Sequence, residues 1–107
     1  MRYNNVVTRI KVKNLTGFDK TRGLIGAKKA YPVFFQTHFG IHTFGLNFPI
    51  DVLILDRNNK IVKIVERLKP NRLFFWDLRF NNVVELPEKE IKKQGIKLKD
   101  IIKLTII

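Results

Sequence analysis

The sequence predicts a mainly β fold, either a single-domain β-sandwich or a partly closed barrel, with two short helices. Short apolar segments recur along the chain, several of them alternate with polar residues, and Gly, Pro, Asn and Asp separate them. Helix signals are confined to residues 18–25 and 87–94. The 107 residues contain no linker, repeat or low-complexity tract, so one domain spanning residues 1–107 is expected.

The first half of the chain predicts three strands and a helix. Residues 6–13 alternate between apolar and basic side chains, which is the pattern of a half-buried strand. Turn and cap residues then predict the helix over residues 18–25. Pro32 opens a short apolar strand over residues 33–35, since proline is tolerated at the first position of a strand. Two glycines bracket a further short strand over residues 41–44.

The strongest strand signal covers residues 50–56, which are almost entirely apolar after Asp51. This pattern predicts a central strand that is covered on both faces. Asn and Asp residues at 56–60 predict a hairpin connection, because these side chains tolerate positive φ, and the return strand is expected over residues 61–68.

The last third of the chain begins with an aromatic segment, residues 73–80, to which no structure is assigned. Residues 83–86 predict another strand. Pro87 and the glutamates that follow it suit the first turn of a helix over residues 87–94. A final strand is expected over residues 101–107.

Composition excludes several classes of site. The sequence has no Cys and no Ser, which rules out disulfides, cysteine metal sites and serine or cysteine nucleophiles. No phosphate loop or dinucleotide fingerprint occurs, so no cofactor is predicted. No metal site is predicted either: His38 and His42 are four apart, but strand signals surround them. The absence of a signal peptide or a membrane-spanning run predicts a cytoplasmic protein.

The formal net charge of +12 is the most unusual feature of the composition. Such a surplus is typical of surfaces that bind nucleic acid or anionic lipid. The preferred explanation is that the lysines keep solvated faces soluble, as composition bias alone would produce.

The leading functional prediction is a small-ligand or partner-binding module without catalysis. Asp51 stands where the chain enters an apolar strand, and a buried carboxylate needs partners. A pocket that gathers Asp51, His42 and Arg22 suits an anion or a small polar ligand. The alternative is that Asp51 accepts hydrogen bonds from backbone amides in the loop before it. The candidate ligand-binding residues are Arg22, His42, Thr43, Asn47, Asp51 and Glu85.

Two other functions remain open. A hydrolase would use Asp51 or Glu85 with His42 in acid–base roles. For Glu85, the preferred explanation is a structural pair with Arg22 or with Lys11 on a neighbouring strand. A nucleic-acid-binding protein would use the basic and aromatic segment that contains Arg67, Lys69, Arg72, Trp76 and Arg79. Within that segment, the preferred explanation of Phe74 and Trp76 is that they cap one end of the hydrophobic core, because large aromatic side chains usually serve packing.

Three blocks of the sequence resemble one protein family. Residues 21–25 (TRGLI) resemble its RGLM segment, residues 41–52 (IHTFGLNFPIDV) resemble its IHTFGMRFPIDV block, and VVELP at 83–87 resembles the start of its VLELPAG…GI…GD ending. The family is domain of unknown function 192, also called uncharacterised protein family 0127. The resemblance implies a mainly β domain with short helices and no established activity. The sequence departs from the pattern at Leu46, where many relatives have Met, and at Lys99, where Gly is usual.

Overall fold

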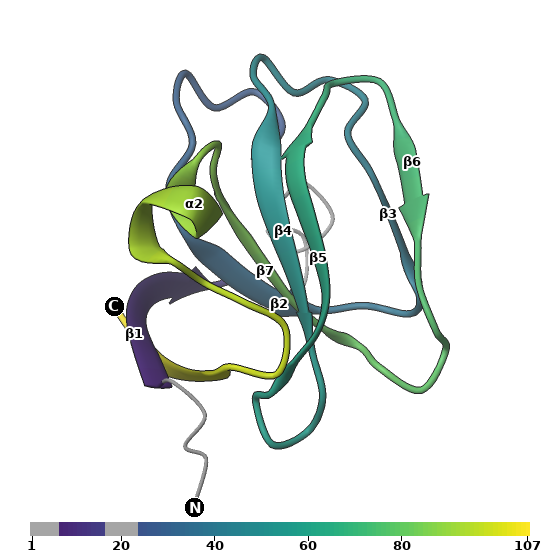
Figure 1. Cartoon of the computed structure of the whole chain (residues 1–107). Coiled ribbons are helices and arrows are strands. Elements are labelled where there is room, and N and C mark those ends of the chain that lie inside the picture. The colour runs from purple at the N-terminus through teal and green to yellow at the C-terminus, as the bar shows by residue number, and fades with distance from the viewer. Residues whose placement is uncertain (1–6, 17–23) are drawn as a thin grey trace, which may run out of the picture.

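The computed structural model describes residues 7–16 and 24–107, which form two β-sheets and a short helix (Figure 1). The strands are β1 (Val7–Asn14), β2 (Val33–Gln36), β3 (Gly40–His42), β4 (Ile50–Leu55), β5 (Ile61–Leu68), β6 (Leu73–Phe75), β7 (Asn82–Pro87) and β8 (Ile101–Ile106), and the helix is α2 (Glu90–Gln94). Within this described part of the chain, no helix is long and apolar enough to cross a membrane.

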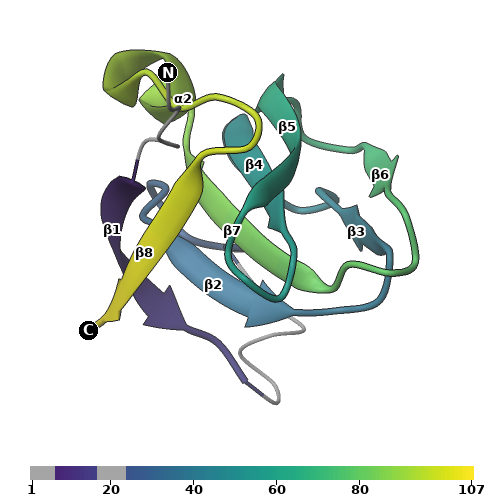
Figure 2. The same cartoon turned by 60° about the horizontal axis from the view of Figure 1, so that its bottom comes forward.

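The larger sheet has six strands in the order β5-β4-β7-β2-β1-β8. It curls so far that its two outer strands approach each other, as Figure 2 shows. A bridge between Lys60 and Ile101 joins them, and Ile61 exchanges backbone hydrogen bonds with the turn before β8. The mainly β prediction is confirmed, and this closure agrees with the partly closed barrel, one of the two architectures that the sequence predicts. The sheet is mixed, because β1 runs parallel to both β2 and β8.

The smaller sheet is a two-stranded antiparallel ribbon of β3 and β6. It lies beside the larger sheet, on the side opposite to α2 (Figures 1 and 2). The predicted aromatic segment at 73–80 therefore supplies a strand, and β3 pairs with that strand rather than with β4.

Two hydrophobic clusters bury both faces of the larger sheet. The first cluster includes Leu53, Leu55 and Leu86 and packs against Ile91 of α2. The second includes Val52, Ile54 and partly buried side chains of the ribbon. All six residues of β4 are buried because successive side chains point to opposite faces, each of which is covered. The prediction of a central strand covered on both sides is confirmed.

The two helix predictions have different outcomes. The second helix is present but shorter than expected, since α2 begins at Glu90. The prediction that Pro87 belongs to this helix is wrong, because Pro87 ends β7 and pairs with Ile50 of β4. Most of the helix predicted over 18–25 lies outside the described residues, and residues 24–26 form a turn.

Candidate functional site

Asp51 is completely buried and bonded to backbone amides from two distant segments. Its Oδ1 accepts a hydrogen bond of 2.8 Å from the amide of Arg67, and its Oδ2 accepts one of 2.9 Å from the amide of Ile91. The first amide lies in a β-bulge, where two residues of β5 stand opposite Asp51 and Arg67 has φ 55°. The second is an otherwise uncapped amide in the first turn of α2. Asp51 therefore ties a bulge and a helix to the sheet.

The pocket predicted around Asp51 and His42 does not form. Asp51 points to the sheet face that carries α2, whereas His42 lies exposed on the ribbon opposite Leu73. The sequence prediction went wrong because it paired residues 41–44 with the strand that contains Asp51. Arg22, the third member of that pocket, lies outside the described residues.

Thr43 and Asn47 also make contacts within the protein. The buried Thr43 hydroxyl accepts a hydrogen bond of 2.8 Å from the amide of Arg72 and donates one of 2.7 Å to the carbonyl of Lys69. It thereby fixes the connection between β5 and β6 to the end of β3. The side-chain amide of Asn47 donates a 3.0 Å hydrogen bond to the carbonyl of Ala27, which joins two loops.

Glu85 is the buried acid that the described contacts leave unexplained. It lies on β7 between Val33 of β2 and Val52 of β4, both of which belong to the second cluster, so its carboxyl faces apolar side chains. No described residue donates a hydrogen bond to it or forms an ion pair with it, so the predicted pair with Lys11 is absent. The other predicted partner, Arg22, lies outside the described residues. Burial raises the pKa of Glu85 to about 7.

The two acids of the hydrolase hypothesis do not face each other. Asp51 stands opposite Leu86, and that register partner lies in the first cluster. Glu85, one residue earlier on β7, therefore points to the other face of the sheet. An acid pair of Asp51 and Glu85 is excluded by the pleat of two adjacent strands.

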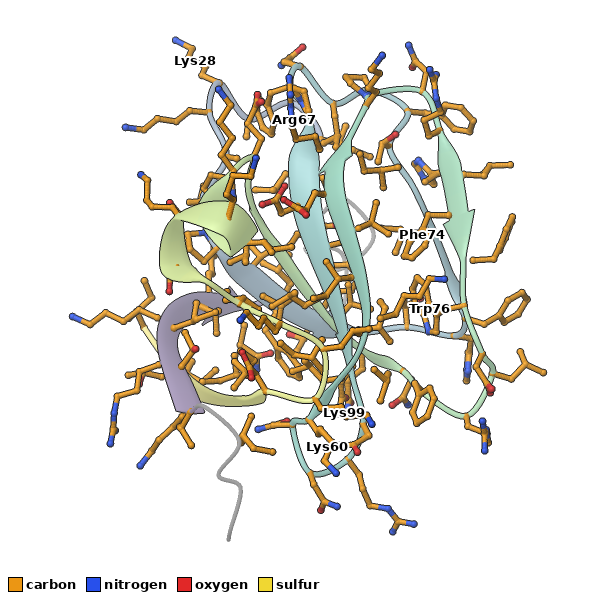
Figure 3. All side chains as sticks on the ribbon, viewed as in Figure 1. Lys28, Lys60, Arg67, Phe74, Trp76 and Lys99 are labelled. Carbon is orange, nitrogen blue, oxygen red and sulfur yellow. The ribbon has the colours of Figure 1, made fainter. Side chains whose placement is uncertain are left out.

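The basic and aromatic residues predicted for nucleic acid divide into three groups. Trp76 is a core residue: it packs on the second cluster with Phe74, both pointing from the ribbon toward the larger sheet (Figure 3), and its indole N–H donates to the carbonyl of Phe80. Arg67 pairs with Glu88 at 3.3 Å. Arg79 pairs with Asp77 at 2.8 Å.

The two paired arginines, Arg67 and Arg79, form the second group. The pair of Arg79 and Asp77 is exposed, and the hydrogen bonds from the Arg79 side chain and amide lower the pKa of Asp77 to about 2.

The third group consists of Lys69 and Arg72, which form no ion pair with any residue that the structure describes. They stand in the connection that leads into β6.

Large apolar side chains are exposed on the outer side of the ribbon, and sequence reasoning missed them. On β6, Phe74 points inward, while Leu73 and Phe75 point outward and are 59% and 57% exposed. If residues 73–75 are assigned as a strand, the alternation of side chains along it predicts that Leu73 and Phe75 lie on the face opposite to Phe74. We call this outer side the aromatic face. It consists of Phe39, His42, Phe44, Leu73 and Phe75.

Comparison with known proteins gives the fold. The sequence matches no family model and no curated protein. A protein of unknown function from Novosphingobium aromaticivorans is similar in structure with a TM-score of 0.71 and 13% identity, over 89% of this chain and 71% of that one. A candidate transcription regulator from Sinorhizobium meliloti is similar with a TM-score of 0.73 and 16% identity, over 89% of this chain and 78% of that one. The chain therefore shares its mainly β fold with both, and the resemblance to domain of unknown function 192 stays a prediction.

Proposed function

We propose that this protein is a non-catalytic binding module whose partner is nucleic acid, held beside the ribbon of β3 and β6. The observation that carries this proposal is the position of Lys69 and Arg72, two exposed cations at the end of an exposed aromatic face. Lys and Arg neutralise phosphates and release counterions, which supplies most of the affinity for nucleic acids.

The distribution of acidic residues supports the proposal. Three acids, Asp51, Glu85 and Asp100, are buried and contribute little to the surface field. Glu88, Glu90 and Asp77 each pair with a basic neighbour. The +12 charge of the chain is therefore concentrated in basic side chains on the surface, which favours a polyanionic partner. The candidate regulator of Sinorhizobium meliloti is compatible with such a partner, but its likeness concerns the fold.

The test measures the anisotropy of labelled DNA and RNA oligonucleotides at several salt concentrations. Binding is expected to weaken steeply between about 50 and 200 mM salt. The double variant Lys69→Gln/Arg72→Gln is expected to lower the slope of log affinity against log salt by about 1 to 2, since each phosphate contact contributes about one.

The matched control is Lys92→Gln/Lys103→Gln, which removes the same charge from α2 and β8, on the other side of the molecule. Its slope should stay close to that of the unaltered protein. Absence of any binding at low salt would overturn the proposal. Equal losses in both double variants would show that charge alone acts, without a site at the ribbon.

A second candidate function, small-ligand binding, is favoured by Glu85. A buried carboxyl among aliphatic side chains suits a ligand that brings its own hydrogen-bond donor, such as a small amine. Thermal unfolding in the presence of small amines tests this idea. A rise in the melting temperature that disappears in Glu85→Gln would support it, and no rise with any amine would argue against it.

A further inference from the structure

The ring of Phe75 lies over Gly40 of the neighbouring strand, with no side chain between them. Its cross-strand partner is Gly40. A Cβ atom on Gly40 would lie 2.7 Å from Cδ1 and 2.9 Å from Cε1 of Phe75, which is closer than real contacts allow. The absence of a side chain at Gly40 therefore leaves the space that the ring of Phe75 occupies, while Phe75 itself stays more than half exposed.

Three further rings lie on the same side of the ribbon. Phe39 precedes β3, is 41% exposed, and its ring centroid lies 6.0 Å from that of Phe75 with an angle of 30° between the planes. The carbonyl of Phe39 accepts a 2.8 Å hydrogen bond from the amide of Trp76, which fixes the position of its backbone. At the other end of β3, His42 and Phe44 stack with centroids 5.3 Å apart and an angle of 24°.

The ribbon itself is held by its inner side chains. Phe74 and Trp76 pack on the second cluster with their ring centroids 5.5 Å apart, and Ile41 packs beside them. The outer rings consequently sit on a support that is anchored to the core. Binding would require little ordering of this face, which lowers its entropic cost.

From these contacts we infer that the aromatic face binds single-stranded nucleic acid, with unpaired bases stacked on Phe75 and its neighbouring rings. This inference rests on the proposed function and names the form of its partner. Flat aromatic rings beside cations are the means by which single strands are bound without sequence readout. Lys69 and Arg72 stand next to Leu73, where they reach the phosphates of a strand whose bases lie on the rings.

Two other partners fit the face less well. A duplex keeps its base faces stacked inside, so exposed ring faces gain nothing from it. Membrane interfaces favour aromatic and aliphatic side chains that project into the lipid. Phe75 instead lies over Gly40, within the space that a side chain at that position would fill.

The experiment compares a labelled oligothymidylate of about 15 nucleotides with a duplex of equal length, at low salt. The key variant is Phe75→Leu, which keeps an apolar side chain but removes the aromatic ring. Loss of one stacked base is expected to weaken single-strand binding roughly tenfold and to leave duplex binding unchanged. Phe75→Trp should retain single-strand affinity, and Tyr31→Ala is the control for an exposed aromatic residue outside the aromatic face.

The possible outcomes separate this inference from the proposed function. If single strand and duplex bind equally well and Phe75→Leu changes neither, nucleic-acid binding stands and the stacking inference is overturned. If neither oligonucleotide binds, the proposed function and the stacking inference are both wrong. If vesicles of mixed neutral and anionic phospholipid bind in a Phe75-dependent manner and oligonucleotides do not, the aromatic face is a membrane surface and the inference is wrong. The fluorescence of Trp76, the single tryptophan, reports whether each variant is folded.

Discussion

Asp51 contributes to stability through the two amides that it holds. Asp51→Ala would leave the amides of Arg67 and Ile91 in the interior without their acceptor. Hydrogen bonds to a charged group contribute about 1.5 to 3 kcal/mol each, so the expected loss is about 4 kcal/mol in the free energy of unfolding. Urea unfolding followed by Trp76 fluorescence measures it. The exposed Glu66→Ala is the control and should change stability by less than about 0.5 kcal/mol, whereas a loss below 1 kcal/mol for Asp51→Ala would contradict the assigned role.

Glu85 makes stability depend on pH in the direction opposite to that of a paired carboxylate. Burial raises its pKa from 4.5 to about 7, so between these values the folded protein holds a proton that the unfolded chain has lost. The contribution of Glu85 to stability is therefore fully present below about pH 4.5 and is lost as the pH rises to about 7. The shift corresponds to at most about 3.4 kcal/mol.

The variant Glu85→Gln isolates this effect, because glutamine is similar in size and does not titrate. Its stability should vary less between about pH 5 and pH 8 than that of the unaltered protein, and it should exceed the latter at the upper end. Urea unfolding at both pH values gives the difference. An unchanged pH slope would mean that Glu85 is ionised and partnered in the folded protein.

At the scale of elements, the ribbon depends on Thr43. Its hydroxyl joins the carbonyl of Lys69 and the amide of Arg72 to the end of β3. Thr43→Val keeps the shape and leaves both backbone groups without that partner, at an expected cost of about 1 to 3 kcal/mol. Thr43→Ser retains the hydroxyl and should lose much less. Thermal unfolding of the two variants gives the comparison, and equal losses would show that the methyl group, rather than the hydroxyl, is what matters.

The elements that the sequence predicts well are those with local signals. β4 is apolar at nearly every position and β5 returns from a turn rich in Asn and Asp, so their pairing is readable from neighbouring residues. The partners of β1 cannot be predicted in this way, because parallel pairing with β8 joins residues about ninety positions apart and leaves no local pattern. β3 is too short to have a pattern of its own, and its assignment to the wrong partner led to the pocket prediction.

The candidate site is predicted only in part, because only some of its residues have a local signal in the sequence. Lys69 and Arg72 were identified from charge and from nearby aromatic residues, which are visible in the sequence. The exposure of Phe75 is not predictable from the sequence. Residues 73–76 are apolar throughout, and only the position of the second cluster decides which side chains face inward. The role of Asp51 was foreseen as acceptance from backbone amides. The sequence does not show which amides donate to Asp51, because Ile91 lies forty residues further along the chain.

For the whole molecule, the concentration of cations on the surface has a consequence for stability. Like charges repel one another in the compact state, and added salt screens this repulsion. The melting temperature and the free energy of unfolding in urea should therefore rise as sodium chloride is added, over the same range in which nucleic-acid affinity falls. Urea is the suitable denaturant because guanidinium chloride is itself a screening salt. The control is Lys92→Gln/Lys103→Gln, which lowers the net charge from +12 to +10 and should reduce the dependence on salt. If the unaltered protein loses stability as salt is added, attractive ion pairs outweigh repulsion on its surface, and the assignment of this surface to a polyanionic partner loses its electrostatic basis.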